Sequence, residues 1–281
     1  TKPLMFELLH YQRLESRLKM FVDLVDETWV RELDNPEKWT FKPTFVRRFG
    51  HLLTDHADKI LAMSATLLSA KDWGWNLGID EAVPFRRSRS TFPKEIRPIV
   101  PVPAGDLSYK ATTPETMAMV VRIIDSLMDK HSNEKGLIHA ISYPTAKYIM
   151  ENSRHQDRLI SHGDAGTRTQ ALDRLIASDS PLVLVSPSFG RGIDLFGDRA
   201  RFQIIVKLPF MQLRDKQTKK RRYSGKMGER WFVLECVRAI VQMSGRIVRS
   251  ENDFGITYIL DSRFERFYRQ MKSDFPSWFS E

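Results

Sequence analysis

The sequence predicts an α/β fold: a parallel sheet with helices on both faces, preceded by a helical segment. From residue 96 onward, short apolar runs of strand length alternate with longer stretches of helical periodicity. Most of these runs end in a polar or glycine-rich turn, as strands of a parallel sheet do at their carboxyl ends. A chain of 281 residues, 42% hydrophobic and 28% charged, is long enough to bury the core of such a fold.

The first part of the chain predicts a helix and then extended segments. Apolar residues at helical spacing predict one long helix from Leu4 to Val30 that ends near Pro36. A short extended segment is expected over 39–45, and a buried strand that runs into a turn over 59–67. Residues 71–95 are rich in Gly, Pro, Arg and aromatic residues and are expected to be irregular. The expected domains are therefore 1–70, a linker over 71–95, and one domain over 96–281.

The alternating elements of the α/β domain can be placed from periodicity. The helix expected at 113–130 has Pro114 and Glu115 in its first turn and is followed by His131, as helix ends favour. Further helices are expected at 143–152, 165–177, 228–244 and 264–271. Strands are expected at 96–101, 136–141, 159–160, 182–186, 202–208 and 256–260.

Net charge is +9, and much of this excess lies between residues 213 and 230. The segment is open to three interpretations: a solvated loop, a contact with nucleic-acid phosphates, or a targeting signal. Its basic residues are Arg214, Lys216, Lys219, Lys220, Arg221, Arg222, Lys226 and Arg230.

The single cysteine, Cys236, allows neither an internal disulfide nor a cysteine-rich metal site. It favours a reducing compartment, the cytoplasm or the nucleus. No apolar run approaches the roughly 18 residues of a membrane span, and the first residues do not read as a signal peptide. We therefore expect an intracellular protein with no membrane partner and no metal site of its own.

The segment from Gln242 to Ser250 places Arg246 and Arg249 three residues apart, after a glutamine and a Ser-Gly step. If this stretch is helical, both guanidinium groups project from one face. A guanidinium presents a planar fork of donors that suits phosphate oxygens. The alternative is a pair of surface arginines on an amphipathic helix.

Polar turns that follow several expected strands would meet at one edge of a parallel sheet. We therefore expect one shared site there. The turns are Ser64–Thr66, Ser142–Pro144, Ser186–Gly192, Pro209–Phe210 and Asp261–Arg263.

Four segments, in this order, resemble motifs in the C-terminal motor half of superfamily 2 helicases of the DinG/XPD type. They are Ser64-Ala-Thr66-Leu67, the stretch from Gly136 to Tyr143, the stretch from Ser186 to Leu195, and Gln242 to Arg249 followed by Asp253-Phe-Gly255. The likeness extends over residues 61–264 and implies a RecA-like second motor domain. This sequence has Gly190-Arg191 where the family commonly has Trp-Glu, which puts any acidic contact there in doubt.

The resemblance implies that ATP binds between two RecA-like domains. Arg246 and Arg249 would then reach its β- and γ-phosphates, and Gln242 would position water or phosphate. Nucleotide-binding or coupling roles are implied for Gly192, Asp194, Gly245, Ser64 and Thr66. DNA contacts are expected from Ser142, Tyr143, Ser186, Ser188 and Phe189, and from Lys219, Lys220, Arg221 and Arg222. Three alternatives stay open: a helix N-cap for Asp194, core packing for Tyr143 and Phe189, and a satisfied core position for His139.

The sequence contains no G-x-x-x-x-G-K-[ST] phosphate loop and no D-E-A-H-like metal-binding motif. In the family both motifs, and any iron–sulfur cysteines, lie in an N-terminal domain, which would be supplied in cis or as a separate chain. We expect an ATP-dependent DNA helicase of repair or replication that moves 5′→3′ on single-stranded or forked DNA, uses ATP with Mg²⁺, and is inactive as this chain alone. The alternatives are a non-catalytic nucleic-acid-binding RecA-like module and an unrelated basic α/β domain.

Overall fold

The computed structural model describes residues 2–35, 38–161, 167–187, 195 and 197–280. The chain forms two compact units, which are described separately. Unit 1 consists of Thr1–Ala62, Ser69–Pro84 and Met211–Phe232. Unit 2 consists of Met63–Leu68, Phe85–Phe210 and Val233–Glu281.

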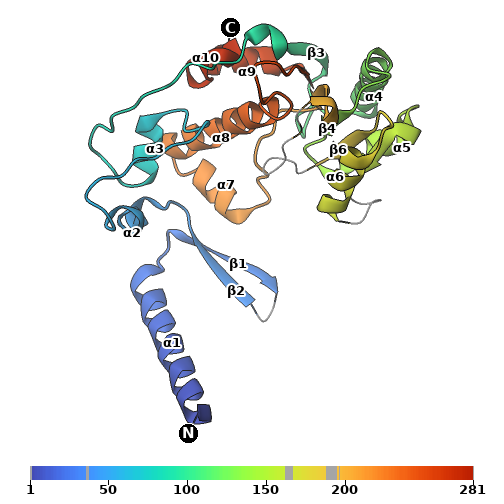
Figure 1. Cartoon of the computed structure of the whole chain (residues 1–281). Coiled ribbons are helices and arrows are strands. Elements are labelled where there is room, and N and C mark those ends of the chain that lie inside the picture. The colour runs from blue at the N-terminus through green and yellow to red at the C-terminus, as the bar shows by residue number, and fades with distance from the viewer. Residues whose placement is uncertain (1, 36–37, 162–166, 188–194, 196, 281) are drawn as a thin grey trace. The chain divides into compact units, whose positions relative to one another are not determined.

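Unit 2 is built on a parallel sheet of six strands in the described part of the chain (Figure 1). The strand order is β3-β8-β7-β4-β6-β5, so β4 lies inside the sheet, with Ile138 opposite Val185 on one side and Ile204 on the other. The strands are β3 (Ile99–Gly105), β4 (Gly136–His139), β5 (Leu159–Ser161), β6 (Val183–Ser186), β7 (Phe202–Ile205) and β8 (Ile256–Asp261).

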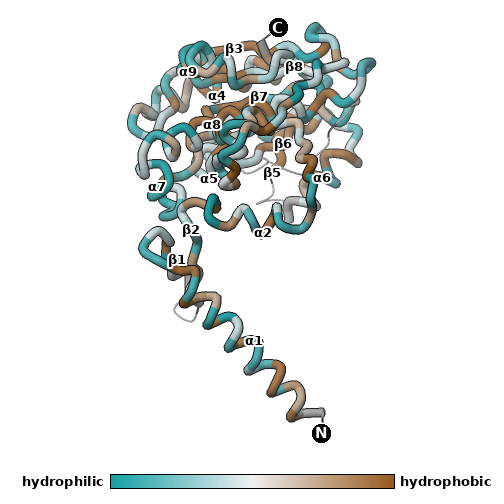
Figure 2. The backbone as a smooth tube through the Cα atoms, turned by 90° about the vertical axis from the view of Figure 1, so that its left-hand side faces the viewer, coloured by the Kyte–Doolittle hydropathy of each residue, from teal (hydrophilic) through white to brown (hydrophobic). Residues whose placement is uncertain are grey.

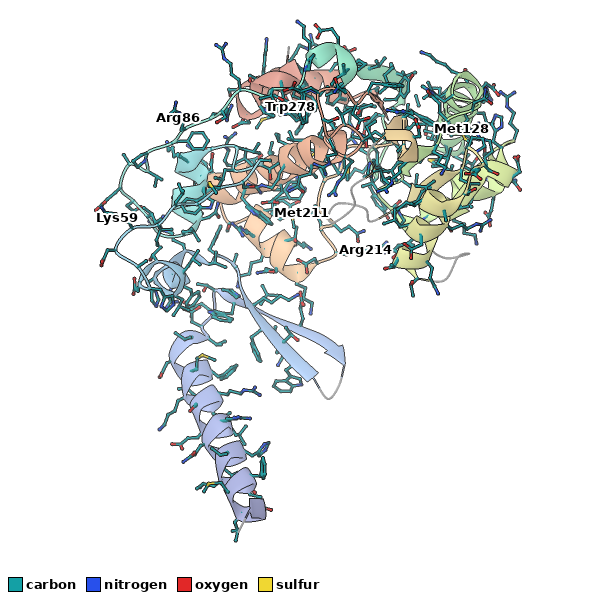
Figure 3. All side chains as sticks on the ribbon, in the orientation of Figure 1. Lys59, Arg86, Met128, Met211, Arg214 and Trp278 are labelled. Carbon is teal, nitrogen blue, oxygen red and sulfur yellow. The ribbon has the colours of Figure 1, made fainter. Side chains whose placement is uncertain are left out.

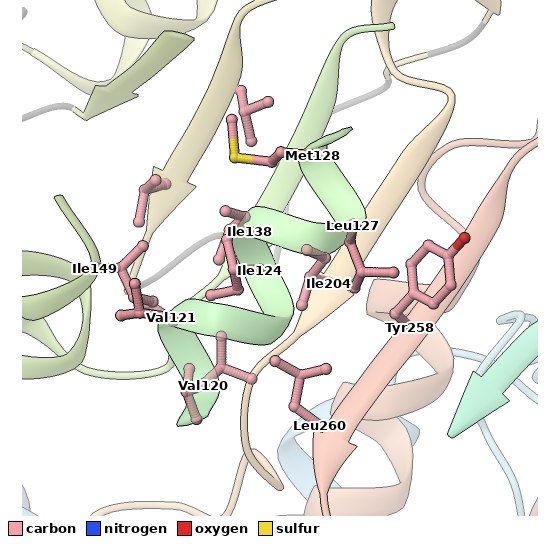
Figure 4. Close-up of a cluster of buried hydrophobic side chains, with 14 of the residues drawn as sticks. Val120, Val121, Ile124, Leu127, Met128, Ile138, Ile149, Ile204, Tyr258 and Leu260 are labelled. Atoms are coloured by element: carbon pink, nitrogen blue, oxygen red, sulfur yellow. The ribbon is translucent and has the colours of Figure 1, made fainter. Parts of the chain in front are cut away.

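Helices cover both faces of this sheet. Side chains such as Ile138 and Ile204 pack with α4 and α5 in one apolar cluster (Figure 4). Their neighbours along the strands, Leu137 and Ile205, belong to two clusters on the opposite face, with α6, α8 and α9. The helices are α4 (Pro114–Lys130), α5 (Tyr143–Asn152), α6 (Arg168–Ala177), α8 (Lys226–Ser244), α9 (Phe264–Met271) and α10 (Ser277–Ser280).

The predicted strands carry apolar residues at successive positions because both faces of a parallel sheet are buried. Figure 2 shows β6 and β7 in the brown of hydrophobic residues. Gly136 has a packing role, since a Cβ at this position would lie 2.4 Å from the ring of Phe202. The predicted fold class, a parallel sheet covered on both faces, is confirmed.

The signals that predicted α4 are confirmed, because Pro114 and Glu115 lie in its first turn and His131 is its C-cap. Thr113 is the N-cap, and its hydroxyl accepts a hydrogen bond from the backbone N–H of Thr116 in a capping box. At the other end, Arg158 donates to the carbonyl oxygens of Met128 and His131, at 2.9 Å each. These contacts satisfy carbonyl groups that the helix itself leaves open.

Unit 1 contains a long helix, a hairpin and short helices. The hairpin strands are antiparallel, with Trp29 opposite Pro43. Large apolar side chains along α1 are exposed, Phe6 to 73%, and Figure 3 draws them projecting from the helix. The elements are α1 (Lys2–Leu24), β1 (Trp29–Asn35), β2 (Lys38–Pro43), α2 (His51–Thr54), α3 (Ala70–Asn76), α7 (Lys216–Arg222) and the first turns of α8.

Two predictions for the N-terminal part of the chain are wrong. The helix expected over 4–30 ends at Leu24, because the carboxylate of Asp26 accepts from the backbone of Thr28 and turns the chain into the hairpin. The strand expected over 59–67 is absent, and Leu61 and Met63 are each 82% exposed. A strand needs a neighbour for its backbone groups, and the described chain provides none at these residues.

Two further segments are more regular than the sequence predicted. The expected linker begins with α3, whose N-cap Ser69 accepts from the backbone of Asp72. The basic segment 213–230 is not a loop, because it contains α7, capped by Asp215 through a 2.6 Å hydrogen bond from the backbone of Thr218. Remaining element ends differ from expectation by a few residues, as helix and strand ends commonly do. None of the described helices is long and apolar enough to span a membrane.

Candidate functional site

The arginine motif, Gln242–Arg249, begins on the last turn of α8, and its two arginines lie beyond the helix. The helix ends at Ser244, whose hydroxyl donates to the carbonyl of Ile240 at 2.9 Å. Beyond it, Ile247 and Val248 are buried in the apolar cluster with α6. The condition under which both guanidinium groups would share one helical face is therefore not met. Arg246 is buried, whereas the side chain of Arg249 is exposed.

Asp253 fixes the backbone around this motif. Its buried carboxylate accepts from the backbone N–H of Arg249 at 3.2 Å and from the backbone N–H of Gly197 at 3.2 Å. Arg201 pairs with the same carboxylate at 2.8 Å. Asp253 lies in one of the quoted motifs, but the sequence alone assigned it no role, because its partners Gly197 and Arg201 come from a distant segment.

The structure brings the Ser64–Thr66 turn to α8. The side-chain amide of Gln242 donates to the hydroxyl of Thr66 at 3.2 Å. Thr66 is buried, and its backbone N–H donates to the hydroxyl of Ser64 at 3.2 Å, while Ser64 itself is exposed. Two of the motifs quoted above, separated by more than 170 residues, are thus in direct contact within unit 2.

Gly245, which the resemblance assigns to the nucleotide, follows α8 directly. Its backbone N–H donates to the carbonyl of Val241 at 3.1 Å. A Cβ built at this position would meet only that carbonyl oxygen, at 3.5 Å, which is an ordinary contact. Packing within the described chain therefore does not require a glycine here.

Ser142 and Tyr143 lie where β4 passes into α5. Ile141 has a left-handed backbone with φ of 66°, and Ser142 then caps α5 by accepting from the backbone of Thr145 at 3.4 Å. The ring of Tyr143 is 67% exposed, so it is not a core residue of the described structure. Ser186, at the end of β6, is buried. Ser188, Phe189, Gly192 and Asp194 lie outside the described residues.

A charged cluster at the same edge of the sheet was not assigned from the sequence. The ammonium group of Lys207 donates to the hydroxyl of Ser142 at 3.1 Å, and partial burial lowers the pKa of this lysine. Asp261 accepts from the backbone of Leu208 at 3.0 Å and from the guanidinium of Arg263 at 2.6 Å. Arg263 also pairs with Asp106 at 3.1 Å. The strand-end turns pointed to this edge, but only the register of β4, β7 and β8 brings these residues together.

Three of the four basic residues proposed to bind DNA make contacts within unit 1. Lys220 donates to the carbonyls of Glu27 and Trp29. The guanidinium of Arg221 lies 3.9 Å from the ring centroid of Trp231 and 5.1 Å from that of Phe45. The guanidinium of Arg222, the third, lies 4.3 Å from the ring centroid of Phe232. The fourth residue, Lys219, is exposed.

His139 occupies a core position. Its Nε2 lies 3.2 Å from the side-chain oxygen of Gln203, whose amide donates to the hydroxyl of Thr257. Burial lowers the pKa of His139 to about 4, and the nearby charge of Arg246 acts in the same direction. His139 is therefore neutral near pH 7. The described residues contain no group of three or more His, Cys, Asp and Glu side chains that could hold a metal ion.

Comparison with known proteins identifies the fold and the family. Residues 124–281 match the helicase C-terminal domain family. Two solved XPD structures, an XPD helicase and an apo XPD, superpose with TM-scores of 0.63 and 0.64 at 17% and 18% identity. The superpositions cover 92% and 95% of this chain, and 49% and 57% of the XPD chains. The sheet is thus that of the RecA-like second domain of XPD helicases.

Curated relatives are helicases as well. The "Probable ATP-dependent helicase MJ0942" of Methanocaldococcus jannaschii is 24% identical over 244 residues, which are 79% of this chain and 37% of that protein. A "Regulator of telomere elongation helicase 1 homolog" of Aedes aegypti is 35% identical over 97 residues, which are 31% of this chain and 9% of that protein. The chain thus spans less than half the length of either relative. With its match over residues 124–281, the chain belongs to the helicase C-terminal domain family, and its fold is like that of XPD structures, as the resemblance to DinG/XPD-type helicases implied.

Proposed function

We propose that this chain is the second motor domain of an ATP-dependent DNA helicase that moves 5′→3′ on single-stranded DNA. It would complete an ATP site whose phosphate loop and Mg²⁺ ligands belong to an N-terminal domain outside these 281 residues. The observation that carries the proposal is the hydrogen bond from Gln242 to Thr66, which joins the arginine motif to the Ser64–Thr66 turn. A module that only binds nucleic acid would not need a contact between these two motifs. Its DNA substrate would place it in the cytoplasm or the nucleus.

The two arginines suit different parts of this role. The backbone of Arg249 is held by Asp253 while the residue is exposed, so a bound nucleotide could reach its side chain. Arg246 is buried near His139, whose neutral ring adds no repelling charge at neutral pH. Both would contact the phosphates of ATP when the two motor domains close. Gln242 would position water or phosphate.

The single-strand track would run along the edge of the sheet where Ser142 and Tyr143 lie. The exposed ring of Tyr143 can stack on a base without selecting a sequence, because every base has a π face. Lys207, at the same edge, adds a cation that can approach a phosphate. Lys219 of α7 provides a further exposed cation.

The test is ATP hydrolysis by the complete helicase, with and without single-stranded DNA, beside this chain alone. The complete protein should show DNA-stimulated turnover that falls by on the order of 10³ or more in Arg249→Ala, because an arginine finger stabilises charge in the transition state. Arg122→Ala, at an exposed position of α4, is the matched control and should leave turnover unchanged. The isolated chain should not hydrolyse ATP.

Two results would contradict the proposal. Robust ATP hydrolysis by the isolated chain would show that the phosphates are held within these 281 residues. A complete protein that binds DNA in a salt-sensitive manner but never hydrolyses ATP would favour the alternative of a non-catalytic nucleic-acid-binding module.

A further inference from the structure

Three side chains hold the short segment Thr66–Leu68 within unit 2. The Nε of Arg238 donates to the carbonyl of Thr66 at 3.1 Å, and Gln242 donates to the hydroxyl of the same residue. The guanidinium of Arg87 donates to the carbonyl of Leu68. The segment belongs to no helix or strand, so side chains satisfy backbone groups that a sheet would otherwise pair.

The backbone of this segment is strained. Leu68 has φ of 62°, a left-handed conformation that is unfavourable for a residue with a Cβ. Its side chain is nevertheless buried, in the apolar cluster that includes α8. A strained conformation persists only where its surroundings impose it, and such positions concentrate at switch regions.

Both arginines are held in place themselves. Arg238 pairs with Glu235, which precedes it on α8. Arg87 also donates to the carbonyl of Phe275, at 3.5 Å. The contacts therefore form a connected support rather than two surface side chains lying by chance against the backbone.

Arg238 and Gln242 are four residues apart on α8, so they project from the same face of the helix. The same helix leads directly to Arg246 and Arg249. Movement of the Thr66–Leu68 segment would therefore be transmitted through α8 to the arginine motif. Loss of Arg238 would uncouple the segment from the helix without removing any group proposed to contact ATP.

We propose that Arg238, supported by Arg87, is a positioning residue that fastens Thr66–Leu68 to α8 and thereby links ATP hydrolysis to movement along DNA. This inference rests on the proposed helicase function. It assigns roles to Arg238 and Arg87, which have no role in that proposal. Neither residue needs to touch ATP or DNA. Their effect should therefore fall on the coupling between hydrolysis and movement rather than on nucleotide binding.

The experiment uses the complete helicase with Arg238→Lys and Arg87→Lys. Lysine keeps the charge but loses the planar fork and the Nε donor. We measure the ATP hydrolysed per nucleotide translocated, together with KM for ATP. The ratio should rise by about tenfold in Arg238→Lys, the scale of one lost charge-assisted hydrogen bond, and by less in Arg87→Lys, while KM changes by less than about twofold. Arg122→Lys on α4 is the control and should leave the ratio unchanged.

A purely structural role would lower thermal stability and reduce hydrolysis and translocation in proportion, which leaves the ratio unchanged and overturns the inference. Absence of DNA-dependent ATP hydrolysis in the wild-type protein would instead contradict the helicase function itself. Amide hydrogen exchange of residues 66–69 in this chain alone gives a second test. Exchange should be faster in Arg238→Lys than in wild type, and unchanged exchange would overturn the proposed fastening.

Discussion

Arg246 and Arg249 lie three residues apart in the sequence, but their surroundings in the structure differ. Arg246 is buried, whereas the side chain of Arg249 is exposed. Removing a buried side chain leaves space in the packed interior, and removing an exposed one does not. Stability and catalysis can therefore be separated at Arg249 more cleanly than at Arg246.

We predict that Arg246→Ala lowers the free energy of unfolding by about 1–3 kcal/mol and that Arg249→Ala changes it by less than about 0.5 kcal/mol. Thermal denaturation of this chain measures both. Equal losses in the two variants would contradict the difference in burial. In the complete helicase, both variants should reduce ATP hydrolysis.

His139 should make the stability of the chain depend on pH. Its pKa is about 4 in the folded chain and ordinarily 6.5, so the unfolded chain takes up this proton first as the pH falls. Stability is therefore lost between about pH 6.5 and pH 4, by up to about 3 kcal/mol from this residue. Denaturant unfolding across this range should show a shallower pH dependence in His139→Gln, which cannot take up the proton. An unchanged dependence would mean that other groups cause it.

Among the helices, α7 shows how a run of basic residues can have two roles. Arg221 lies over the rings of Trp231 and Phe45, while Lys219 is exposed two residues earlier. A guanidinium stacked on aromatic rings contributes to folding, and an exposed ammonium is available to a polyanion. Charge counting along the sequence cannot distinguish these two roles.

We predict that Arg221→Ala destabilises the chain by about 1–3 kcal/mol, through the loss of two cation–π contacts and of the packing of the side chain. Lys219→Ala should leave stability unchanged and should reduce the salt dependence of DNA binding by about one phosphate contact. Thermal denaturation and DNA titrations at several salt concentrations measure these effects. The prediction fails if Lys219→Ala destabilises the chain or leaves the salt dependence of binding unaltered.

For the molecule as a whole, the exposed apolar surface is informative. Side chains of α1 are exposed along its length, and so are Leu61 and Met63 in the segment where a strand was predicted. Large exposed apolar patches usually mark an interaction site. In the proposed helicase, the N-terminal motor domain would cover α1 and Leu61 of unit 1, and Met63 of unit 2.

We predict that this chain alone binds a fluorescent apolar dye and that the separately prepared N-terminal domain of the same helicase suppresses the signal. Leu61→Ser and Met63→Ser should lower dye binding in the isolated chain and weaken its association with that domain, because both changes remove apolar contact area. Dye fluorescence and a binding titration measure the two effects. Association that is unaffected by the substitutions would place the interface elsewhere.

Local sequence was sufficient to predict the fold class and most elements of unit 2, because periodicity, helix-end signals and apolar runs act over a few neighbouring residues. Pro114 and Glu115 lie in the first turn of α4 as predicted, and the strands of the parallel sheet lie near their expected positions. The order of the motifs was also sufficient to identify the family. The segment 59–67 was predicted wrongly because a strand depends on neighbours that local sequence does not show.

The assembly of the candidate site, in contrast, depends on tertiary packing. The contacts of Thr66 with Gln242 and Arg238, and those of Asp253 with Gly197 and Arg201, join segments that lie far apart in the chain. Tertiary packing also buried Arg246, left Arg249 exposed, and placed Arg221 over two aromatic rings. The physical reason is that burial and long-range hydrogen bonds depend on how strands and helices pack, whereas the patterns read along a sequence report only on near neighbours.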